Sequence, residues 1–217
     1  MHSMASPMST ARPVTRMTGV IDVSFRDDAT LLAGLRAGDR DAQLALYDAY
    51  GRHVRRVVGR ILGPDPQLAD VLQDVFLNAL KNAGSVRDPE RLKGWLTAVA
   101  VNTARGRIRR RTRRRWLRFL PSHEVPEVAD PGADPEAREA LRQLYVLLDK
   151  MSSELRIPFT LRFIDDMPLT EVAEACSVSL ATIKRRLTRA EHRFVALARG
   201  NEALAPWVAR HPRWRSL

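Results

Sequence analysis

Arginine side chains crowd one short stretch in the middle of the chain. From Arg105 to Arg118, nine of the fourteen residues are arginine and none is acidic. A guanidinium is permanently charged, and its planar fork of N–H donors matches phosphate oxygens and the edge of guanine. Like-charge runs often form solvated tails. This run continues a helical pattern, which favours a surface that binds a polyanion.

A second cationic segment extends from Lys184 to Arg193 and holds five basic residues against the single acid Glu191. The 217-residue chain has 36 basic and 25 acidic residues, a formal net charge of +11. The two segments carry +9 and +4, so the remaining residues are slightly acidic together. The charge is therefore concentrated in two places, which predicts nucleic acid as the first partner class and an anionic membrane surface as the second.

Other chemistries lack the residues that they need. No run of eighteen apolar residues is present, so no membrane span is predicted. The single Cys176 cannot form an internal disulfide, and the five histidines have no metal-ligand spacing, so neither cofactor nor metal is expected. Ser177, Ser179 and Tyr145 have no histidine or acidic cluster near them in sequence, which argues against an enzyme. A cytoplasmic, non-enzymatic protein is the expectation.

Helical periodicity runs through the chain, and no segment alternates like a strand, so an all-α fold with two small helical domains is predicted. Four helices are expected in the first domain. The first covers Leu31–Leu35 and is closed by Gly38, and the second is longer, capped by Asp41 and ended by Gly63-Pro64. The third runs from Asp65 to about Asn82, and the fourth starts at Asp88-Pro89 and runs into the arginines. In the longer helix, the expected core stripe is Leu44, Tyr47, Val54, Val58 and Ile61.

Composition divides the chain into five parts. We expect a disordered N-terminal arm over 1–27, a first domain over 28–118, a linker over 119–137, a second domain over 138–199 and a C-terminal extension over 200–217. The linker is acidic and proline-rich, with four prolines, five acids and no Lys or Arg from Pro121 to Glu136. Three roles stay open for the extension, which is rich in Trp and Arg: it docks a regulator, packs on the second domain, or has no function.

The second domain contains the pattern of a helix-turn-helix. A helix over 169–175 is followed by a tight turn at Cys176-Ser177-Val178 and by a helix that Ser179 caps. Ile183, Leu187 and Ala190 form its buried stripe, and the small Ala173 lets the two helices approach closely. The outward residues are then Thr182, Lys184, Arg185, Arg186 and Arg189. Such a helix fits the major groove of DNA, whereas the alternative is an ordinary helical hairpin with a solvated basic face.

The third helix carries two unlike faces. Leu68, Val71, Leu72, Val75 and Ala79 form a core stripe on a helical wheel. The opposite side holds Asp70, Gln73, Asp74 and an apolar residue, Leu77. Carboxylates beside an exposed leucine favour a protein-docking face over a solvated one, and its partner is expected to offer arginines and apolar side chains.

The fourth helix combines an aromatic ring, an amide and cations. Trp95 and Asn102 are seven residues apart and lie on nearly the same line of the helix, which continues into Arg105, Arg107, Arg109 and Arg110. This combination is suited to holding a DNA backbone and accepting an unstacked base, although Trp95 alone is more often a core residue.

Taken together, these segments resemble the bacterial RNA polymerase sigma factors of the extracytoplasmic-function (ECF) group. The segment 70–77 is similar to the docking motif of that family's region two, and Trp95-Leu96 with Asn102 matches its promoter-opening segment. The segment 172–187 matches its region-four helix-turn-helix. The resemblance covers roughly residues 28 to 198, with two departures: Gly106 stands where an acid is frequent, and Ala181 where a glycine is frequent.

The resemblance implies a role without an active site. Core RNA polymerase would be bound at its β′ clamp helices by Asp70, Gln73, Asp74 and Leu77. The first domain would then melt and capture the minus-ten element, and the second would bind the minus-thirty-five element as duplex. Members of this group are commonly held by an anti-sigma protein, a further candidate partner. The alternative function is a stand-alone helix-turn-helix regulator that acts without polymerase.

Overall fold

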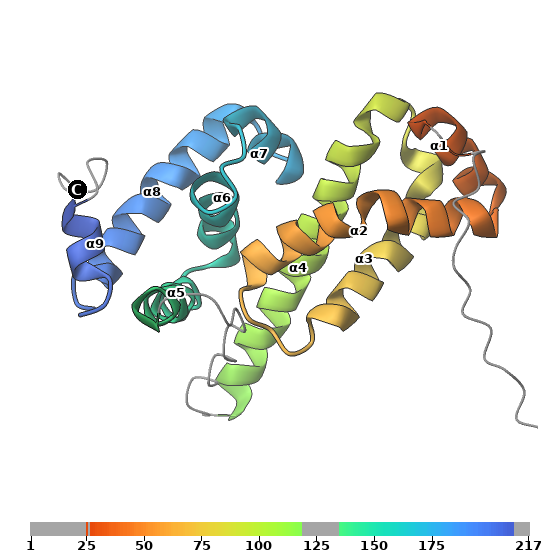
Figure 1. The fold of residues 1–217 in the computed structure, drawn as a ribbon. Helices are drawn as coiled ribbons and strands as arrows, with labels where there is room; N and C mark the ends of the chain where they lie inside the picture. Colours follow the sequence, from red (N-terminus) through yellow and green to blue (C-terminus); the bar gives the residue numbers. More distant parts are fainter. Residues whose placement is uncertain (1–24, 26, 119–134, 211–217) are drawn as a thin grey trace, which may run out of the picture.

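The computed structural model describes residues 25, 27–118 and 135–210, and the regular elements of this part of the chain are all helical, which confirms the all-α class (Figure 1). The first domain consists of α1 (Asp28–Ala37), α2 (Arg40–Leu62), α3 (Leu68–Asn82), two short 3₁₀ turns at Ala83–Ser85 and Pro89–Arg91, and α4 (Leu92–Arg118). The second consists of α5 (Pro135–Leu148), α6 (Ser153–Phe163), α7 (Leu169–Ala175), α8 (Leu180–Ala198) and α9 (Ala205–Arg210). The predicted arm and linker lie almost wholly outside the described residues.

Glycines end the first two helices as predicted, but the cap of α2 is a different residue. Gly38 and Gly63 have φ of 75° and 70°, the left-handed region that favours glycine. The expected cap Asp41 is wrong, because α2 is capped by Asp39, whose Oδ1 accepts the Asp41 N–H at 2.8 Å. Asp41 instead places a negative charge in the first turn of the helix, where the helix dipole favours it.

Helix α3 starts later than its sequence indicates. Asp65 was the expected cap, yet the helix begins at Leu68. The Asp65 carboxylate accepts the Gln67 N–H at 2.9 Å and so forms a turn before the helix. The same carboxylate is bound by Arg107 of α4, at 3.2 Å and 3.3 Å, which fixes its position outside the helix.

The core stripe of α2 is not the one expected at its N-terminal end. Leu44 and Tyr47 are each 58% exposed, so this part of the prediction is wrong. Ala42 and Leu46 face the core instead, in line with the buried Val54, Val57, Val58 and Ile61. Both sets fit a helical period, and only packing against the neighbouring helices decides between them.

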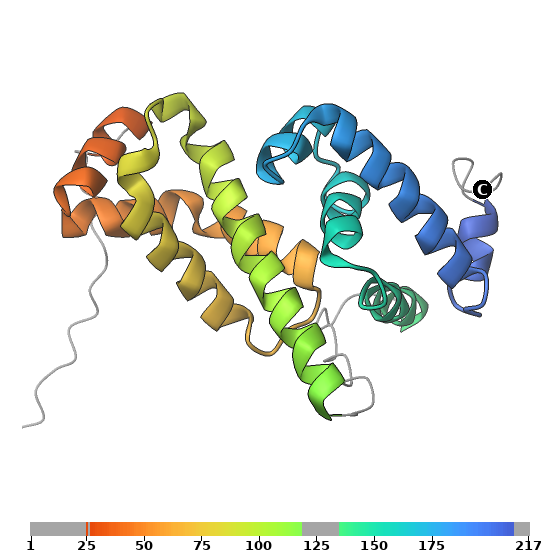
Figure 2. The same ribbon diagram turned by 180° about the vertical axis from the view of Figure 1, so that it is seen from behind.

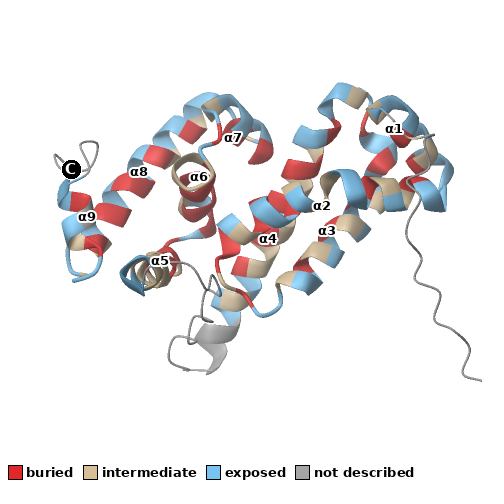
Figure 3. Cartoon of the chain, in the orientation of Figure 1, coloured by how far each residue is buried: buried red, intermediate tan, exposed pale blue. Residues whose placement is uncertain are grey.

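The buried apolar side chains of the described residues form three clusters, and one of them includes residues of both domains. Figure 3 shows where the buried residues lie along the helices. That cluster takes members from α2, α3 and α4 and from α6, α7 and α8. The other two lie within one domain each. The two domains therefore share part of a core, although each also has a core of its own.

The described part of the C-terminal extension packs on the second domain. Leu204 and Val208 are buried in the cluster of that domain, and the Asn201 side-chain amide donates to Gln143 Oε1 at 2.8 Å. Of the three roles left open for the extension, the structure supports packing. The residues 211–217 and the Trp207 side chain lie outside the described part.

Candidate nucleic-acid and protein interfaces

Residues 169–198 form the predicted helix-turn-helix. The turn between α7 and α8 contains Ser177 with φ of 55° and is closed by a hydrogen bond from the Val178 N–H to the Ala173 carbonyl at 3.1 Å. Ser179 caps α8, because its Oγ accepts the Thr182 N–H at 3.2 Å. The predicted stripe of Ile183, Leu187 and Ala190 is buried.

The five cationic and hydroxyl side chains predicted for the outer face of α8 differ in their exposure to solvent. Lys184, Arg185 and Arg189 are exposed. Arg186 is half-buried, and its Nη2 lies 3.7 Å from Glu154 Oε2 of α6. Thr182 is also half-buried, and its hydroxyl lies 2.9 Å from Ser179 Oγ. The surface available to a partner is thus centred on the first three residues.

The predicted protein-docking face of α3 is uncovered. Asp70, Gln73 and Asp74 are exposed, and Leu77 is 44% exposed, whereas the core side of the helix at Val71, Val75 and Ala79 is buried. No other part of the described chain covers this face. Its geometry is therefore compatible with a partner, and the role of the four residues stays a prediction.

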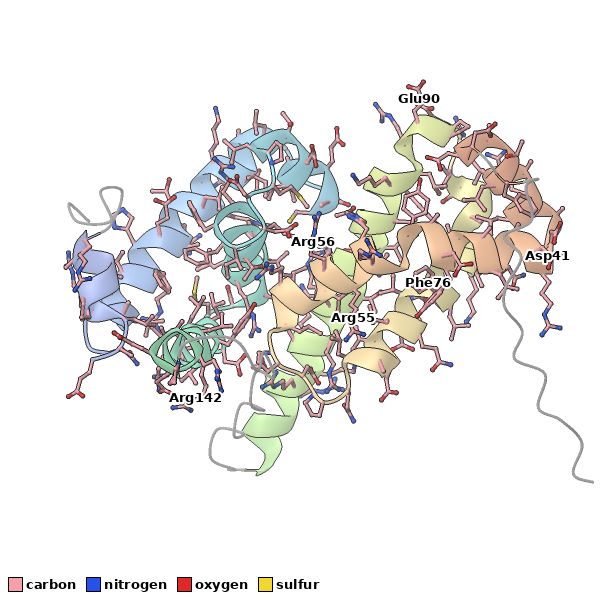
Figure 4. The ribbon with its side chains drawn as sticks, in the orientation of Figure 1. Asp41, Arg55, Arg56, Phe76, Glu90 and Arg142 are labelled. Carbon is pink, nitrogen blue, oxygen red and sulfur yellow. The ribbon has the colours of Figure 1, made fainter. Side chains whose placement is uncertain are left out.

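Two residues of α2 that the sequence assigned to the core extend this face. Leu44 and Tyr47 belong, with Leu77, to the four large apolar residues that are exposed in the described chain. The Tyr47 ring lies against the half-buried Phe76 ring of α3, with centroids 5.0 Å apart, so the exposed side of α2 at Tyr47 adjoins α3. Phe76 is labelled on α3 in Figure 4. We call Leu44, Tyr47, Phe76 and Leu77, with the α3 acids beside them, the docking face. The apolar period of α2 includes Leu44 and Tyr47, but the same period also fits residues that face a core.

Helix α4 presents an amide at a polar groove. Asn102 is exposed, and its Oδ1 accepts from Arg105 Nη1 at 2.6 Å. The groove between α3 and α4 is lined by Asp74, Asn78, Asn82, Val99, Asn102, Thr103, Gly106 and Arg110. At Gly106, a Cβ would meet only open space, so this departure from the family pattern leaves the groove wider. Trp95 is half-buried and packs against the core of the first domain.

The arginines of α4 divide between two directions. Arg109 and Arg110 are exposed, whereas the Arg107 side chain is 19% exposed and donates to Asp65. The physical reason is the helix period, because residues 107 and 111 fall on one face, and both guanidiniums reach Asp65. The four predicted cations, Arg105, Arg107, Arg109 and Arg110, therefore do not form one continuous rail.

Asp65 stays charged in this setting. Burial raises the pKa of its carboxyl, but the hydrogen bonds from Arg107 and the Gln67 N–H, with the charges of Arg107 and Arg111, lower it by more. The net result is a pKa below the ordinary value for aspartate. A charged Asp65 holds Arg107 and turns it away from solvent.

The second domain is a helix-turn-helix with an exposed cationic face. The first domain has a separate basic helix and an uncovered face that is acidic and apolar. Together these features define a two-domain DNA-binding transcription factor. Residues 46–114 match Sigma-70 region 2, and residues 141–193 match Sigma-70, region 4. Together these matches span more than half of the 217 residues.

Relatives with curated functions share both domains. The chain is 30% identical over 172 residues to ECF RNA polymerase sigma factor SigM of Mycobacterium tuberculosis, covering 79% of this chain and 85% of SigM. It is 28% identical over 172 residues to the ECF RNA polymerase sigma-E factor of Escherichia coli K12, covering 75% of this chain and 90% of that protein. The chain belongs to the sigma-70 family, in its ECF group, and directs promoter-specific transcription. A stand-alone regulator is not favoured.

Two solved structures have the same fold. CnrH, in complex with the cytosolic domain of CnrY, aligns with a TM-score of 0.54 at 23% identity, covering 81% of this chain and 99% of CnrH. RpoE from Bartonella quintana, in complex with the anti-sigma factor NepR, aligns with a TM-score of 0.54 at 20% identity, covering 75% of this chain and 99% of RpoE. None of the helices in the described ranges is long and apolar enough to cross a membrane.

Arg107→Ala is expected to destabilise the first domain by about 1–3 kcal/mol, because it removes hydrogen bonds to the buried Asp65 carboxylate. Arg110→Ala, at an exposed position of the same helix, is the control, with an expected change within about 0.5 kcal/mol. Urea denaturation followed by circular dichroism measures both.

The pH dependence of this difference follows from the lowered pKa of Asp65. The charged Asp65 carboxylate stabilises the folded domain at pH values above the ordinary pKa of aspartate. This stabilisation is lost as the pH falls through the lowered pKa of Asp65 in the folded chain. The difference in the free energy of unfolding between Arg107→Ala and the parent is therefore expected to become smaller at acidic pH. A gap that is equal at neutral and acidic pH would contradict the assignment to Asp65.

Proposed function

We propose that this sigma factor binds core RNA polymerase through the docking face of α2 and α3, and promoter DNA through α4 and α8. The observation that carries the proposal is the uncovered Leu77, which lies among Asp70, Gln73 and Asp74 and continues into Leu44 and Tyr47 on α2. The face thus combines apolar area with carboxylates, the chemistry that suits a helix with leucines and arginines. The β′ clamp helices of polymerase are the proposed partner.

The minus-ten element is assigned to the exposed side of α4. Arg109 and Arg110 are exposed and are the proposed phosphate contacts, and Asn102 lies at the polar groove with both a donor and an acceptor. The half-buried Trp95 supports the start of the helix. A protein that binds single-stranded bases needs polar side chains that hydrogen-bond to the base edges and surfaces on which the bases stack. Helix α4 provides polar side chains beside its cations.

The minus-thirty-five element is assigned to the exposed face of α8. Arg185 is the candidate for a bidentate contact with guanine, and Lys184 and Arg189 for phosphates. Thr182 and Arg186 are placed at the edge of this face. The role requires no catalytic residue and no cofactor, because binding alone directs polymerase to a start site.

An anti-sigma protein is a further proposed partner. The two structures of similar fold were solved as complexes, one of them with a protein described as an anti-sigma factor. The exposed apolar positions at Leu44, Tyr47 and Leu77 offer such a protein a surface. We assign the protein to the cytoplasm, where bacterial polymerase acts.

Reconstituted transcription tests the proposed function directly. Core polymerase is incubated with genomic fragments of the source bacterium, with and without the purified chain, and RNA 5′ ends are sequenced. New start sites that share two upstream elements are expected only when both proteins are present. If the chain protects the same DNA by itself and core polymerase adds nothing, the sigma-factor mechanism is wrong for this protein.

Asp74→Arg is expected to weaken binding to core polymerase by about tenfold or more, which corresponds to about 1.4 kcal/mol. The substitution places an arginine opposite the arginines expected on the partner, where like charges repel. Affinity is measured by fluorescence anisotropy of the labelled chain. Glu202→Arg, an exposed position on the second domain, makes the same charge change away from the docking face and is expected to leave affinity unchanged. Equal affinity for Asp74→Arg and the parent would remove Asp74 from the interface.

Arg185→Ala is expected to reduce binding to particular upstream sequences by about 1–3 kcal/mol if Arg185 contacts a base. The measurement compares duplexes from mapped promoters with versions changed at single upstream positions. A uniform loss across these sequences would identify Arg185 as a phosphate contact instead.

A further inference from the structure

A crevice lies between the C-terminal half of α4 and the turn that joins α5 to α6. Helix α4 packs on α6, and both views show this turn beside the lower part of α4 (Figures 1 and 2). The crevice has a volume of about 650 Å³, within the range of small-molecule sites. Four residues of α4 and residues 149–153 line it, and only Arg109 among them has a part in the proposed function. The crevice is therefore separate from the docking face and from the exposed face of α8.

Three exposed cations line the crevice: Arg109 and Arg113 of α4 and Lys150 of the turn. Residues 109 and 113 are four positions apart, so they lie on the same side of the helix. Arg107 and Arg111 are held by acids, but none of these three cations pairs with a carboxylate of the described residues. Their charges are therefore available to an anionic ligand.

Two acids close to the crevice are already bound to arginines. Asp149 lines it, but its Oδ2 lies 3.1 Å from Arg111 Nη2 and its Oδ1 accepts from Arg156 Nη1. Glu154 of α6 is not among the lining residues, and its Oε2 lies 3.7 Å from Arg186 Nη2. The negative charge near the crevice is thus compensated, and the cations that line it give it a positive potential.

The N-terminal end of α6 meets the crevice at Ser152 and Ser153. Ser152 is the N-cap residue, but its side chain makes no capping hydrogen bond. Its carbonyl accepts from the Leu155 and Arg156 N–H groups, at 3.0 Å and 2.9 Å, which leaves the N–H groups of Ser153 and Glu154 without a partner in the helix. Such N–H groups, at the positive end of the helix dipole, are suited to bind an oxyanion.

A buried hydroxyl without a partner lies at the same place. Ser153 is 9% exposed, and within the described ranges its hydroxyl makes no hydrogen bond. A helical side chain tilts toward the N-terminus of its helix, so this hydroxyl is directed to the end of α6 that meets the crevice. Buried polar groups in proteins nearly always have a partner. The unused hydroxyl therefore indicates a partner that comes from outside the described chain.

The polar groups that converge at the crevice are mainly hydrogen-bond donors: two backbone N–H groups, one hydroxyl and three cationic side chains. A phosphate group has both the charge and the number of acceptor oxygens to use them. Most of the remaining lining is apolar, with Ile108 and Met151 in its wall. A ligand that fills the crevice therefore carries an apolar body beside its phosphate.

We propose that this crevice binds a small phosphate monoester with an apolar body. The Ser153 hydroxyl and the N–H groups of Ser153 and Glu154 donate to the phosphate oxygens, Arg113 and Lys150 provide positive charge, and the body packs on the apolar wall. A DNA phosphate is a diester on a wide duplex, which does not fit beside a hydroxyl that is nine-tenths buried. Binding requires neither DNA nor core polymerase.

Isothermal titration calorimetry of the full-length chain compares three probes at constant ionic strength: phenyl phosphate, inorganic phosphate and phenol. Phenyl phosphate is expected to bind one-to-one and about fivefold or more tighter than inorganic phosphate, because its ring buries apolar area. Phenol, which lacks the phosphate, is expected to show no binding. Equal affinity for phenyl phosphate and inorganic phosphate would contradict the apolar body. Absence of one-to-one binding by either would overturn the site.

Ser153→Ala is the sharpest test, because it removes only a hydroxyl that makes no hydrogen bond in the described fold. It is expected to weaken phenyl phosphate binding by about fivefold or more. The melting temperature without ligand is expected to stay at the parent value or to rise. Ser85→Ala, at an exposed serine of the first domain, is the matched control. Equal affinity of Ser153→Ala and the parent would overturn the proposal.

Lys150→Ala and Arg113→Ala test the charge of the crevice. Each is expected to weaken phenyl phosphate binding by about threefold or more, because an exposed cation loses part of its effect to solvent. Lys81→Ala, exposed on α3, removes the same charge away from the crevice and is expected to leave the affinity unchanged. If Lys81→Ala lowers the affinity as much as Lys150→Ala, the probe responds to net charge alone and the proposal is wrong.

Nuclear magnetic resonance locates the bound phosphate. With ¹⁵N-labelled full-length chain, the amide signals of Ser153 and Glu154 are expected to shift on addition of phenyl phosphate and to do so much less in Ser153→Ala. Signals that shift only in other parts of the chain would place the phosphate elsewhere and overturn the site.

The affinity for a random-sequence DNA duplex separates a small-molecule site from a DNA contact. Ser153→Ala is expected to bind the duplex as tightly as the parent, because a duplex does not reach the buried hydroxyl. If Ser153→Ala lowers the affinity for DNA by the same factor as that for phenyl phosphate, the crevice holds a DNA phosphate and the proposal is wrong. Both results are independent of whether the chain stimulates core polymerase.

Discussion

A helix that ends inside a protein needs hydrogen-bond donors for its last carbonyl groups, and this requirement governs how α2 is placed. Gly63 turns the chain back and satisfies one carbonyl, while Arg156 and Tyr145 of the second domain satisfy three more. Each donor must come within hydrogen-bond distance of the helix end, so α5 and α6 are positioned relative to α2. The shared apolar cluster and the packing of α7 on α4 are consistent with that placement.

Two acids beside α4 determine which of its arginines are drawn away from solvent. Arg111 is directed toward Asp149 and Asp65, and Arg107 toward Asp65, because these acids lie where the second domain and the start of α3 meet the helix. Arg109 and Arg110, on other faces, remain exposed. A run that looks uniform in sequence is therefore divided into cations that hold the protein together and cations that face solvent.

The sequence predicts most of what is local. The helix-turn-helix, its Ser179 cap and the buried stripe of α8 all follow from spacing within about thirty residues, and the structure confirms them. Leu44 and Tyr47 were assigned to the core but are exposed, because an apolar helical period does not show whether that side of the helix is buried. The contact between the two domains was not predicted, because Arg156 looks like an ordinary surface arginine in the sequence and the carbonyls that it binds, those of Ile61 and Leu62, lie more than ninety residues away. A single sequence contains no signal that pairs a side chain with a distant backbone.

The docking face lies outside the contact between the two domains, because Leu77, Leu44 and Tyr47 are exposed while the domains are in contact. A protein partner can therefore reach this face without any movement of one domain relative to the other.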